Sequence, residues 1–143
     1  MKLQTASAVI SFTKKLEEDS AQFYESLAQR YTNDREVLLS FAKENRKNVV
    51  LTERAYYGVI TDALEGCYSF QINADEYAFE TKLAENASYD VALNKAVEME
   101  EKIIKFYSDA AEQSKSLLAD IPRAFAMIAK KRNIRSSKLK SLQ

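Results

Sequence analysis

Four charged residues stand out in this chain because their types and spacing could do chemistry. Glu17 and Glu100 occupy the same place in a short repeated pattern, and Arg132 and Arg135 lie three residues apart near the C-terminal end. A guanidinium keeps its charge in a protein, and its planar fork suits bidentate pairing with a carboxylate. The two acids and the two bases have a formal sum of zero, so they could form an internal network of ion pairs.

The two glutamates belong to an internal repeat that covers most of the chain. The first pattern is Leu16-Glu17-Glu18, Phe23-Tyr24 and Ala28, and it recurs 83 residues later as Met99-Glu100-Glu101, Phe106-Tyr107 and Ala111. A second pattern, Leu38, Phe41 and Ala42, recurs 87 residues later as Phe125, Ile128 and Ala129. Each half is therefore predicted to be one helical hairpin, and the two halves should face each other across a pseudo-twofold axis.

Four long helices are expected to position these residues, because apolar side chains recur at steps of three and four. They should run over about 6–31, 34–64 and from 88 onward, with the fourth beginning at Pro122. The long connection between the second and third helices should contain a short helix at about 75–85. Asn45 and Asn48 share a helix face with Phe41, and Arg132 and Arg135 share one with Ile128, so all four should point inward.

The fold class that follows is all-α: a single domain over residues 1–143, built as an antiparallel four-helix bundle. Hairpin 1 should span about 5–65, the crossover 66–87 and hairpin 2 about 88–143. Two Gly and one Pro in 143 residues are too few for a sandwich or barrel of many short strands. Two hairpins joined by one long crossover is a known bundle topology.

These patterns resemble the rubrerythrin branch of the ferritin-like family over nearly the whole chain. That family has a glutamate seven residues before the Tyr of a Phe-Tyr pair, and then Glu-x-x-His after an apolar residue and an Ala on the next helix. Two such hairpins hold a di-iron centre. By this resemblance, Glu17 and Glu100 match the first-helix metal ligands, and Tyr24 and Tyr107 match the tyrosines beside them.

The second-helix ligand positions depart from the family pattern. The Glu-x-x-His slots fall on Asn45 and Asn48 in the first half and on Arg132 and Arg135 in the second. Four of the six ligands that the resemblance implies are therefore replaced, two of them by cations. The prediction is a ferritin-like protein that has lost its di-iron site, with a salt-bridge and amide network in its place, acting as a non-catalytic structural or interaction module with no cofactor.

Two other functions stay open on the sequence. The first is a metal-binding oxidoreductase or peroxidase of the rubrerythrin class, in which Glu17, Glu44 and Glu100 hold iron or another divalent metal. The second is a module that binds nucleic acid or another polyanion through its last helix. That stretch is basic: eight Lys or Arg and one Asp lie between Gln113 and the end of the chain.

Composition narrows the function classes further. The chain has no His, which removes the usual general base and the commonest metal ligand. Its single cysteine, Cys67, cannot form an intramolecular disulfide, and no uncharged run approaches the length of a membrane span. We therefore expect a cytoplasmic protein with no signal peptide and no membrane partner. Tyr56, Tyr57 and Tyr68, with Phe70, could cover one end of the bundle or form the contact of a homodimer.

Overall fold

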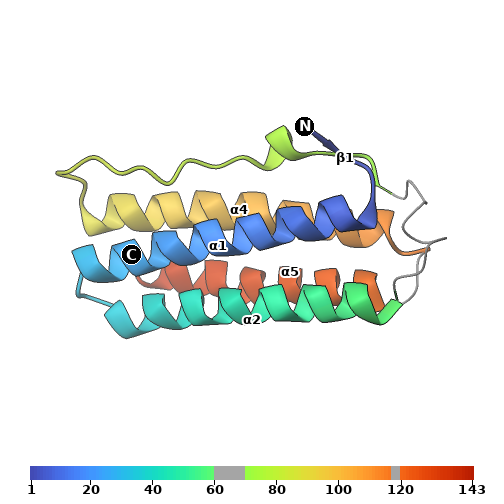
Figure 1. Ribbon diagram of the computed structural model, residues 1–143. Helices are drawn as coiled ribbons and strands as arrows, with labels where there is room; N and C mark the ends of the chain where they lie inside the picture. Colours follow the sequence, from blue (N-terminus) through green and yellow to red (C-terminus); the bar gives the residue numbers. More distant parts are fainter. Residues whose placement is uncertain (60–69, 117–119) are drawn as a thin grey trace.

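Four long helices lie side by side in a computed structural model that describes residues 1–59, 70–116 and 120–143 (Figure 1). The helices are α1 (Ala6–Arg30), α2 (Arg35–Val59), α4 (Tyr89–Gln113) and α5 (Asp120–Ser141). The chain also has two short strands, β1 (Lys2–Leu3) and β2 (Ile72–Asn73), and a 3-10 helix, η1 (Ala74–Tyr77). The expected all-helical bundle is confirmed.

The helices pair closely within each half of the chain and more loosely between the halves. The chain turns back on itself after α1 and again after α4, so α1 packs along α2 and α4 along α5. Between the halves, α2 contacts α5 and α1 contacts α4. Within the described part of the chain, no helix is long and apolar enough to cross a membrane.

Side-chain caps set the start of α1 and α4. The Thr5 hydroxyl accepts a hydrogen bond from the Ala8 amide at 3.2 Å, and the Ser88 hydroxyl accepts one from the Val91 amide at 3.2 Å. Helix α5 begins at Asp120, two residues before the expected start at Pro122. The expected continuation of the second helix to about residue 64 lies outside the described residues.

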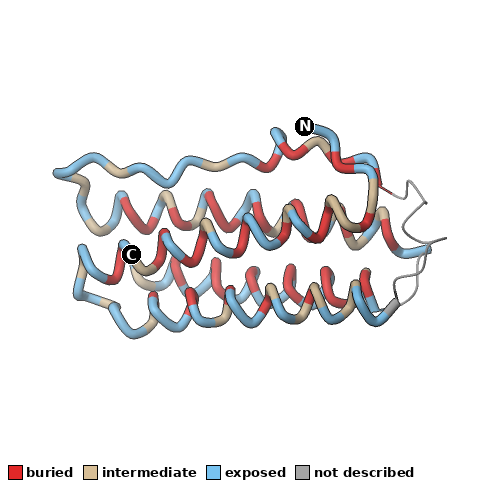
Figure 2. The backbone as a smooth tube through the Cα atoms, viewed as in Figure 1, coloured by how far each residue is buried: buried red, intermediate tan, exposed pale blue. Residues whose placement is uncertain are grey.

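The interior is formed by one stripe of each helix (Figure 2). In α4, six residues spaced three or four apart are buried: Ala92, Ala96, Met99, Ile103, Phe106 and Ala110. The stripes of α2 and α5 are apolar at their ends but polar in the middle, where Asn45, Asn48, Arg132 and Arg135 are buried. The polar residues therefore lie inside the bundle, as their spacing from Phe41 and Ile128 predicts.

The crossover corrects the sequence prediction, because residues 75–85 do not form a helix beyond the single turn of η1. After that turn the chain runs extended along the groove between α1 and α4 (Figure 1). Tyr77 and Phe79 both pack on the core. Residues two apart share a face in an extended chain but lie on opposite sides of a helix, so packing both rings favours the extended form.

The N-terminus helps to hold the crossover, which the sequence did not indicate. Strand β1 pairs antiparallel with β2, with Lys2 opposite Asn73 and Leu3 opposite Ile72. The Phe70 amide donates to the Gln4 carbonyl at 3.2 Å, and the Ala74 amide donates to the Met1 carbonyl at 2.8 Å. These two-residue strands are too short to give an alternating pattern that can be read from sequence.

Candidate functional site: a buried ion-pair network

The middle of the bundle contains a cluster of charged side chains that is closed to solvent. Glu17 of α1, Glu100 of α4 and Arg132 of α5 are completely buried, and Arg135 is 3% exposed. Each lies on the inward stripe of its helix, between turns of apolar residues. Buried charges are costly unless they are paired and hydrogen-bonded, so the partners of each group decide what this site can do.

Arg132 links the two glutamates. Its Nη1 donates to both carboxylate oxygens of Glu100, and its Nη2 donates to Oε2 of Glu17; the ion-pair distances are 2.5 Å. The same Nη2 also lies 3.2 Å from the Ser20 hydroxyl. One guanidinium from α5 is therefore bound to α1 and α4 at once, across the centre of the bundle.

Arg135, one turn further along α5, binds the opposite side of the cluster. Its Nη1 donates to Oδ1 of Asn45 at 2.6 Å and to Oε1 of Glu100 at 3.3 Å. Its Nη2 donates to the Phe41 carbonyl and to Oε1 of Glu44, both at 3.3 Å. The guanidinium carbon lies 4.9 Å from the ring centroid of Phe41, so the cation also stacks on an aromatic face.

The two asparagines of α2 connect the ions to the rest of the bundle. Asn45 accepts from both arginines through Oδ1, and its amide donates to the Ser20 hydroxyl at 2.7 Å. Asn48 donates to Oε1 of Glu17 at 3.2 Å. An asparagine amide offers donors and an acceptor at once, which lets Asn45 stand between two cations and a hydroxyl.

The two tyrosines are equivalent in the repeat but not in the structure. The Tyr107 hydroxyl donates to Oε1 of Glu17 at 2.8 Å. The Tyr24 hydroxyl has no hydrogen-bond partner among the described residues, and the Arg135 guanidinium carbon lies 5.4 Å from the Tyr24 ring centroid. Glu100 is turned toward two arginines, so it does not accept a hydrogen bond from Tyr24 that would be equivalent to the bond between Tyr107 and Glu17.

Burial and charge shift the acid–base properties of this cluster. Desolvation raises the pKa of both tyrosines well above its usual range; the charge of Glu100 adds to the rise for Tyr24, and that of Glu17 adds to it for Tyr107. Burial by itself lowers the pKa of Arg132, but the charges of Glu100 and Glu17 outweigh it and raise this pKa well above the usual value. The guanidinium is therefore a fixed cation, and neither phenol acts as an acid near neutral pH.

The donor set does not fit a di-iron centre. Iron needs several anionic oxygens and, in this family pattern, two imidazoles, whereas the chain has no His and both buried carboxylates are bound to guanidinium groups. A cation at a ligand position repels a metal ion at short range. Across the described residues, no three His, Cys, Asp or Glu side chains are grouped so that they could hold a metal.

Glu44, the third carboxylate of the metal-binding alternative, lies at the edge of the cluster. Its side chain is 39% exposed, and its carboxylate is 3.3 Å from Nη2 of Arg135. The three glutamates therefore do not form a group of their own, because Arg132 and Arg135 lie among them.

The last helix presents fewer free cations than its sequence suggests. Of the seven Lys and Arg of α5, Arg132 and Arg135 are buried and bound to internal partners. The other five, Arg123, Lys130, Lys131, Lys138 and Lys140, are exposed, and polyanion binding through them stays a prediction.

One participant was missed at the level of sequence. Ser20 lies on the predicted inward stripe of the first helix, and its hydroxyl contacts Asn45 and Arg132. The signal was available: a small hydroxyl residue lies between Leu16 and Phe23 on this stripe, three residues after Glu17. Such a residue leaves room for a long side chain from a facing helix.

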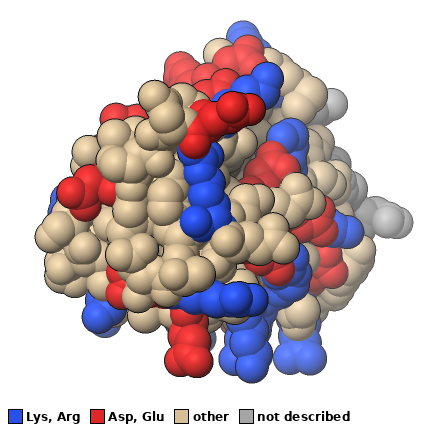
Figure 3. Space-filling view, turned by 90° about the vertical axis from the view of Figure 1, so that its left-hand side faces the viewer, with Lys and Arg blue, Asp and Glu red and all other residues tan. Residues whose placement is uncertain are grey.

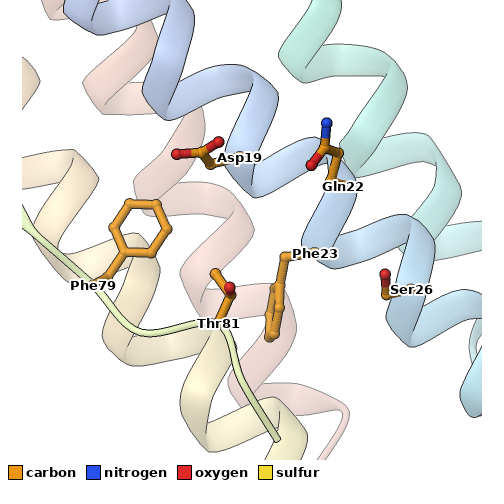
Figure 4. A pocket seen from close by; sticks show the side chains of 6 residues that line it. All are labelled: Asp19, Gln22, Phe23, Ser26, Phe79 and Thr81. Atoms are coloured by element: carbon orange, nitrogen blue, oxygen red, sulfur yellow. The ribbon is translucent and has the colours of Figure 1, made fainter.

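A surface pocket between α1 and the crossover offers no comparable chemistry (Figure 4). Phe79 and Thr81 of the crossover lie opposite Asp19 and Phe23 of α1 (Figure 4). Asp19 is the only titratable residue that lines this pocket, and its carboxylate is paired with Lys15 at 2.6 Å. The buried network is therefore the candidate site.

Comparison with known proteins does not assign this chain to a family. No family model, no curated protein and no solved structure matches it. The account of its function therefore depends on the residues of the chain and on the geometry described above.

Proposed function

We propose that this chain is a ferritin-like, rubrerythrin-like bundle in which an ion-pair network has replaced a di-iron centre, and that it serves as a non-catalytic structural or interaction module. One observation carries this proposal: the Arg132 guanidinium is completely buried and bridges Glu17 and Glu100. The two glutamates are the positions that match the family's first-helix ligands. The cation thus lies between the two carboxylates that would otherwise bind metal.

The pattern of replacements supports the same proposal. Asn45 and Arg132 are equivalent in the repeat, as are Asn48 and Arg135, and all four are buried next to the glutamates. A surface position that drifted by chance would have no reason to keep a neutral charge sum and complementary hydrogen bonds. The finer topology, an antiparallel ferritin-like bundle with one long crossover, is part of this proposal.

The network suits a structural role better than a catalytic one. Its arginines cannot exchange protons near neutral pH, so they cannot act as general acids or bases. The cluster is also closed to solvent, which leaves no path for a substrate. A buried ionic cluster often contributes little net stability compared with an apolar core, but its geometry can restrict helices to one register. Arg132 connects three helices, and we propose that this fixes their relative positions.

Iron loading tests the proposal. The purified protein would be incubated anaerobically with excess Fe(II), desalted and weighed by native mass spectrometry, with a parallel thermal unfolding curve. We expect no bound iron and no rise in Tm, because a ligand that binds only the folded state must stabilise it. Two irons per chain, lost in the variant E17Q/E100Q, would overturn the proposal and support the oxidoreductase alternative.

A designed variant makes the same test in the opposite direction. The substitutions N45E, N48H, R132E and R135H restore the ligand types that the family pattern carries at these positions. If the bundle is of the ferritin-like type, this variant should bind iron where the parent does not, provided that circular dichroism shows it folded. A folded variant without iron would contradict the ferritin-like assignment. The predicted homodimer is checked separately by light scattering.

A further inference from the structure

The two grooves between the halves of the bundle differ in whether another segment of the chain covers them. The groove between α1 and α4 is covered by the crossover, whose Tyr77 and Phe79 pack on the core. The groove between α2 and α5 has no covering segment among the described residues, and it contains a hollow of about 570 Å³. An open groove between two helices is a common docking place for a peptide segment.

The lining of the open groove combines apolar and basic side chains. Val50 and Leu51 of α2 and Met127 of α5 supply its apolar part; Val50 is 46% exposed and Met127 is 42% exposed. The charged residues that line it are all basic: Lys43, Arg46, Lys47, Arg54 and Lys131. Arg46 forms an ion pair with Glu25 at 3.0 Å, and none of the other four forms an ion pair with another described residue.

Charge is divided between the two sides of the molecule. Apart from the buried Arg132, Arg135, Glu17 and Glu100, helices α2 and α5 carry ten Lys or Arg and four Asp or Glu, whereas α1 and α4 carry six Lys or Arg and eight Asp or Glu. Residues 70–88 of the crossover add one base and four acids on the α1–α4 side. In the end-on view, Lys and Arg side chains, with an acidic side chain among them, project from the lower edge, on the side of α2 (Figure 3).

The crossover shows how an extended segment lies over a helix pair of this bundle. It carries aromatic anchors and acidic residues, and lysines of α4 donate to its backbone. Lys95 and Lys102 donate to the carbonyls of Glu80 and Glu76, both at 3.4 Å. Charge and anchors of the same kind would suit the more basic groove on the opposite side.

We infer that the α2–α5 groove is a docking site for an acidic peptide segment of a partner protein, with aliphatic or aromatic anchors that fill the hollow above Val50, Leu51 and Met127. The acidic side chains of the segment would pair with Lys43, Lys47, Arg54 and Lys131. This inference rests on the proposed interaction function and names the chemistry of its partner.

Other occupants fit the groove less well. A second copy placed by a twofold axis would bring two basic faces together, and copies placed head to tail would form a ring or an open filament instead of a dimer. Nucleic acid would use the lysines, but no aromatic side chain lines the groove for stacking on bases. A membrane surface is flat, whereas the apolar residues here line a hollow.

The test is fluorescence anisotropy with a labelled synthetic 18-residue peptide that carries Glu on one helical face and Leu and Phe on the other. We expect saturable binding that weakens with added salt and is at least about tenfold weaker for the variant K47E/K131E. The variant V50S/M127S should weaken binding similarly, because it removes the apolar contact and keeps the charges. The control K2E/K82E makes the same change in net charge on β1 and the crossover and should bind within about twofold of the parent.

Three further probes give the results that would overturn the inference. They are a scrambled peptide of the same composition, a 20-base-pair DNA duplex and phosphatidylserine vesicles. A polyanion site would be indicated instead if the protein binds the scrambled peptide or DNA, and if K47E/K131E abolishes this binding while V50S/M127S leaves it unchanged. Vesicle binding without peptide binding would indicate a membrane surface, and a concentration-dependent mass that K47E/K131E abolishes would indicate a second copy. No binding of any probe by folded, iron-free protein would refute this inference alone, whereas stoichiometric iron would refute the proposed function.

Discussion

Removal of the central cation gives the clearest energetic prediction. The Arg132→Met substitution replaces the aliphatic part of the arginine with another unbranched side chain but removes the guanidinium group, so the two carboxylates lose their main partner. Glu17 would keep its bonds from Tyr107 and Asn48, whereas Glu100 would keep only the 3.3 Å contact with Arg135. The loss therefore falls mainly on Glu100, a buried charge with one weak partner.

The expected cost is about 3–5 kcal/mol, the range for breaking a buried ion pair by removing one member. The free energy of unfolding of natural domains is about 5–15 kcal/mol in total, so the expected cost of Arg132→Met is a large share of the stability. For a chain of this length, it corresponds to a fall in Tm on the order of 10 °C. Urea unfolding followed by circular dichroism at 222 nm, with the parent and the variant at equal concentration, measures it.

Two comparisons separate the buried charge from the loss of packing. Arg46 and Glu25 form an exposed bidentate pair with both bonds at 3.0 Å, so Arg46→Met should cost under about 1 kcal/mol. In the Arg132→Met background, Glu100→Gln should recover part of the loss, because it removes the uncompensated charge. The reasoning is refuted if Arg132→Met lies within about 1 kcal/mol of the parent, as it would if the cluster were open to water.

Three further predictions concern other residues in and around the buried network. Tyr107→Phe should lower the free energy of unfolding in urea by about 1.5–3 kcal/mol because it removes a donor to charged Glu17. Tyr24→Phe should leave it nearly unchanged. Equal costs would refute the asymmetry of the two tyrosines. Stability should fall above about pH 10, by about 1.4 kcal/mol per pH unit for each buried tyrosine, because burial raises the pKa of Tyr24 and Tyr107 in the folded state only. The tyrosines of the unfolded chain ionise near pH 10 while the buried phenols of the folded protein stay neutral, so their contribution to stability is intact below that pH. In thermal unfolding between pH 9 and 11, stability should therefore fall less steeply with pH for Tyr107→Phe than for the parent. The exposed control Tyr57→Phe should leave this slope unchanged. Arg135→Lys should lower the free energy of unfolding in urea by about 1–3 kcal/mol, since one ammonium group cannot reproduce the planar fork that contacts Asn45, Glu100 and the Phe41 carbonyl. An unchanged stability would mean that only the positive charge matters at this position.

The helices and the inward positions of the polar residues could be predicted because a long stripe of period 3.6 fixes which side chains face the core. Asn45 and Arg132 follow such stripes from Phe41 and Phe125, and both are buried. The internal repeat then placed Glu17 and Glu100 at the same level of the bundle.

The partner of each group within the network could not be predicted from the stripes. Tyr24 and Tyr107 are equivalent by sequence, and the difference between them arises because the arginines come from only one half of the chain. The crossover was misread as a helix because its apolar residues are few, and the packing of Tyr77 and Phe79 on neighbouring helices decided its form. Long-range contacts of this kind leave little local signal.

The most direct measurement is a crystal structure of protein grown with iron and soaked in Fe(II), with diffraction data collected at the iron absorption edge. Our account predicts continuous density for the Arg132 guanidinium between the carboxylates of Glu17 and Glu100, with no anomalous peak there. An anomalous peak between these carboxylates, with Arg132 turned out to solvent, would contradict it.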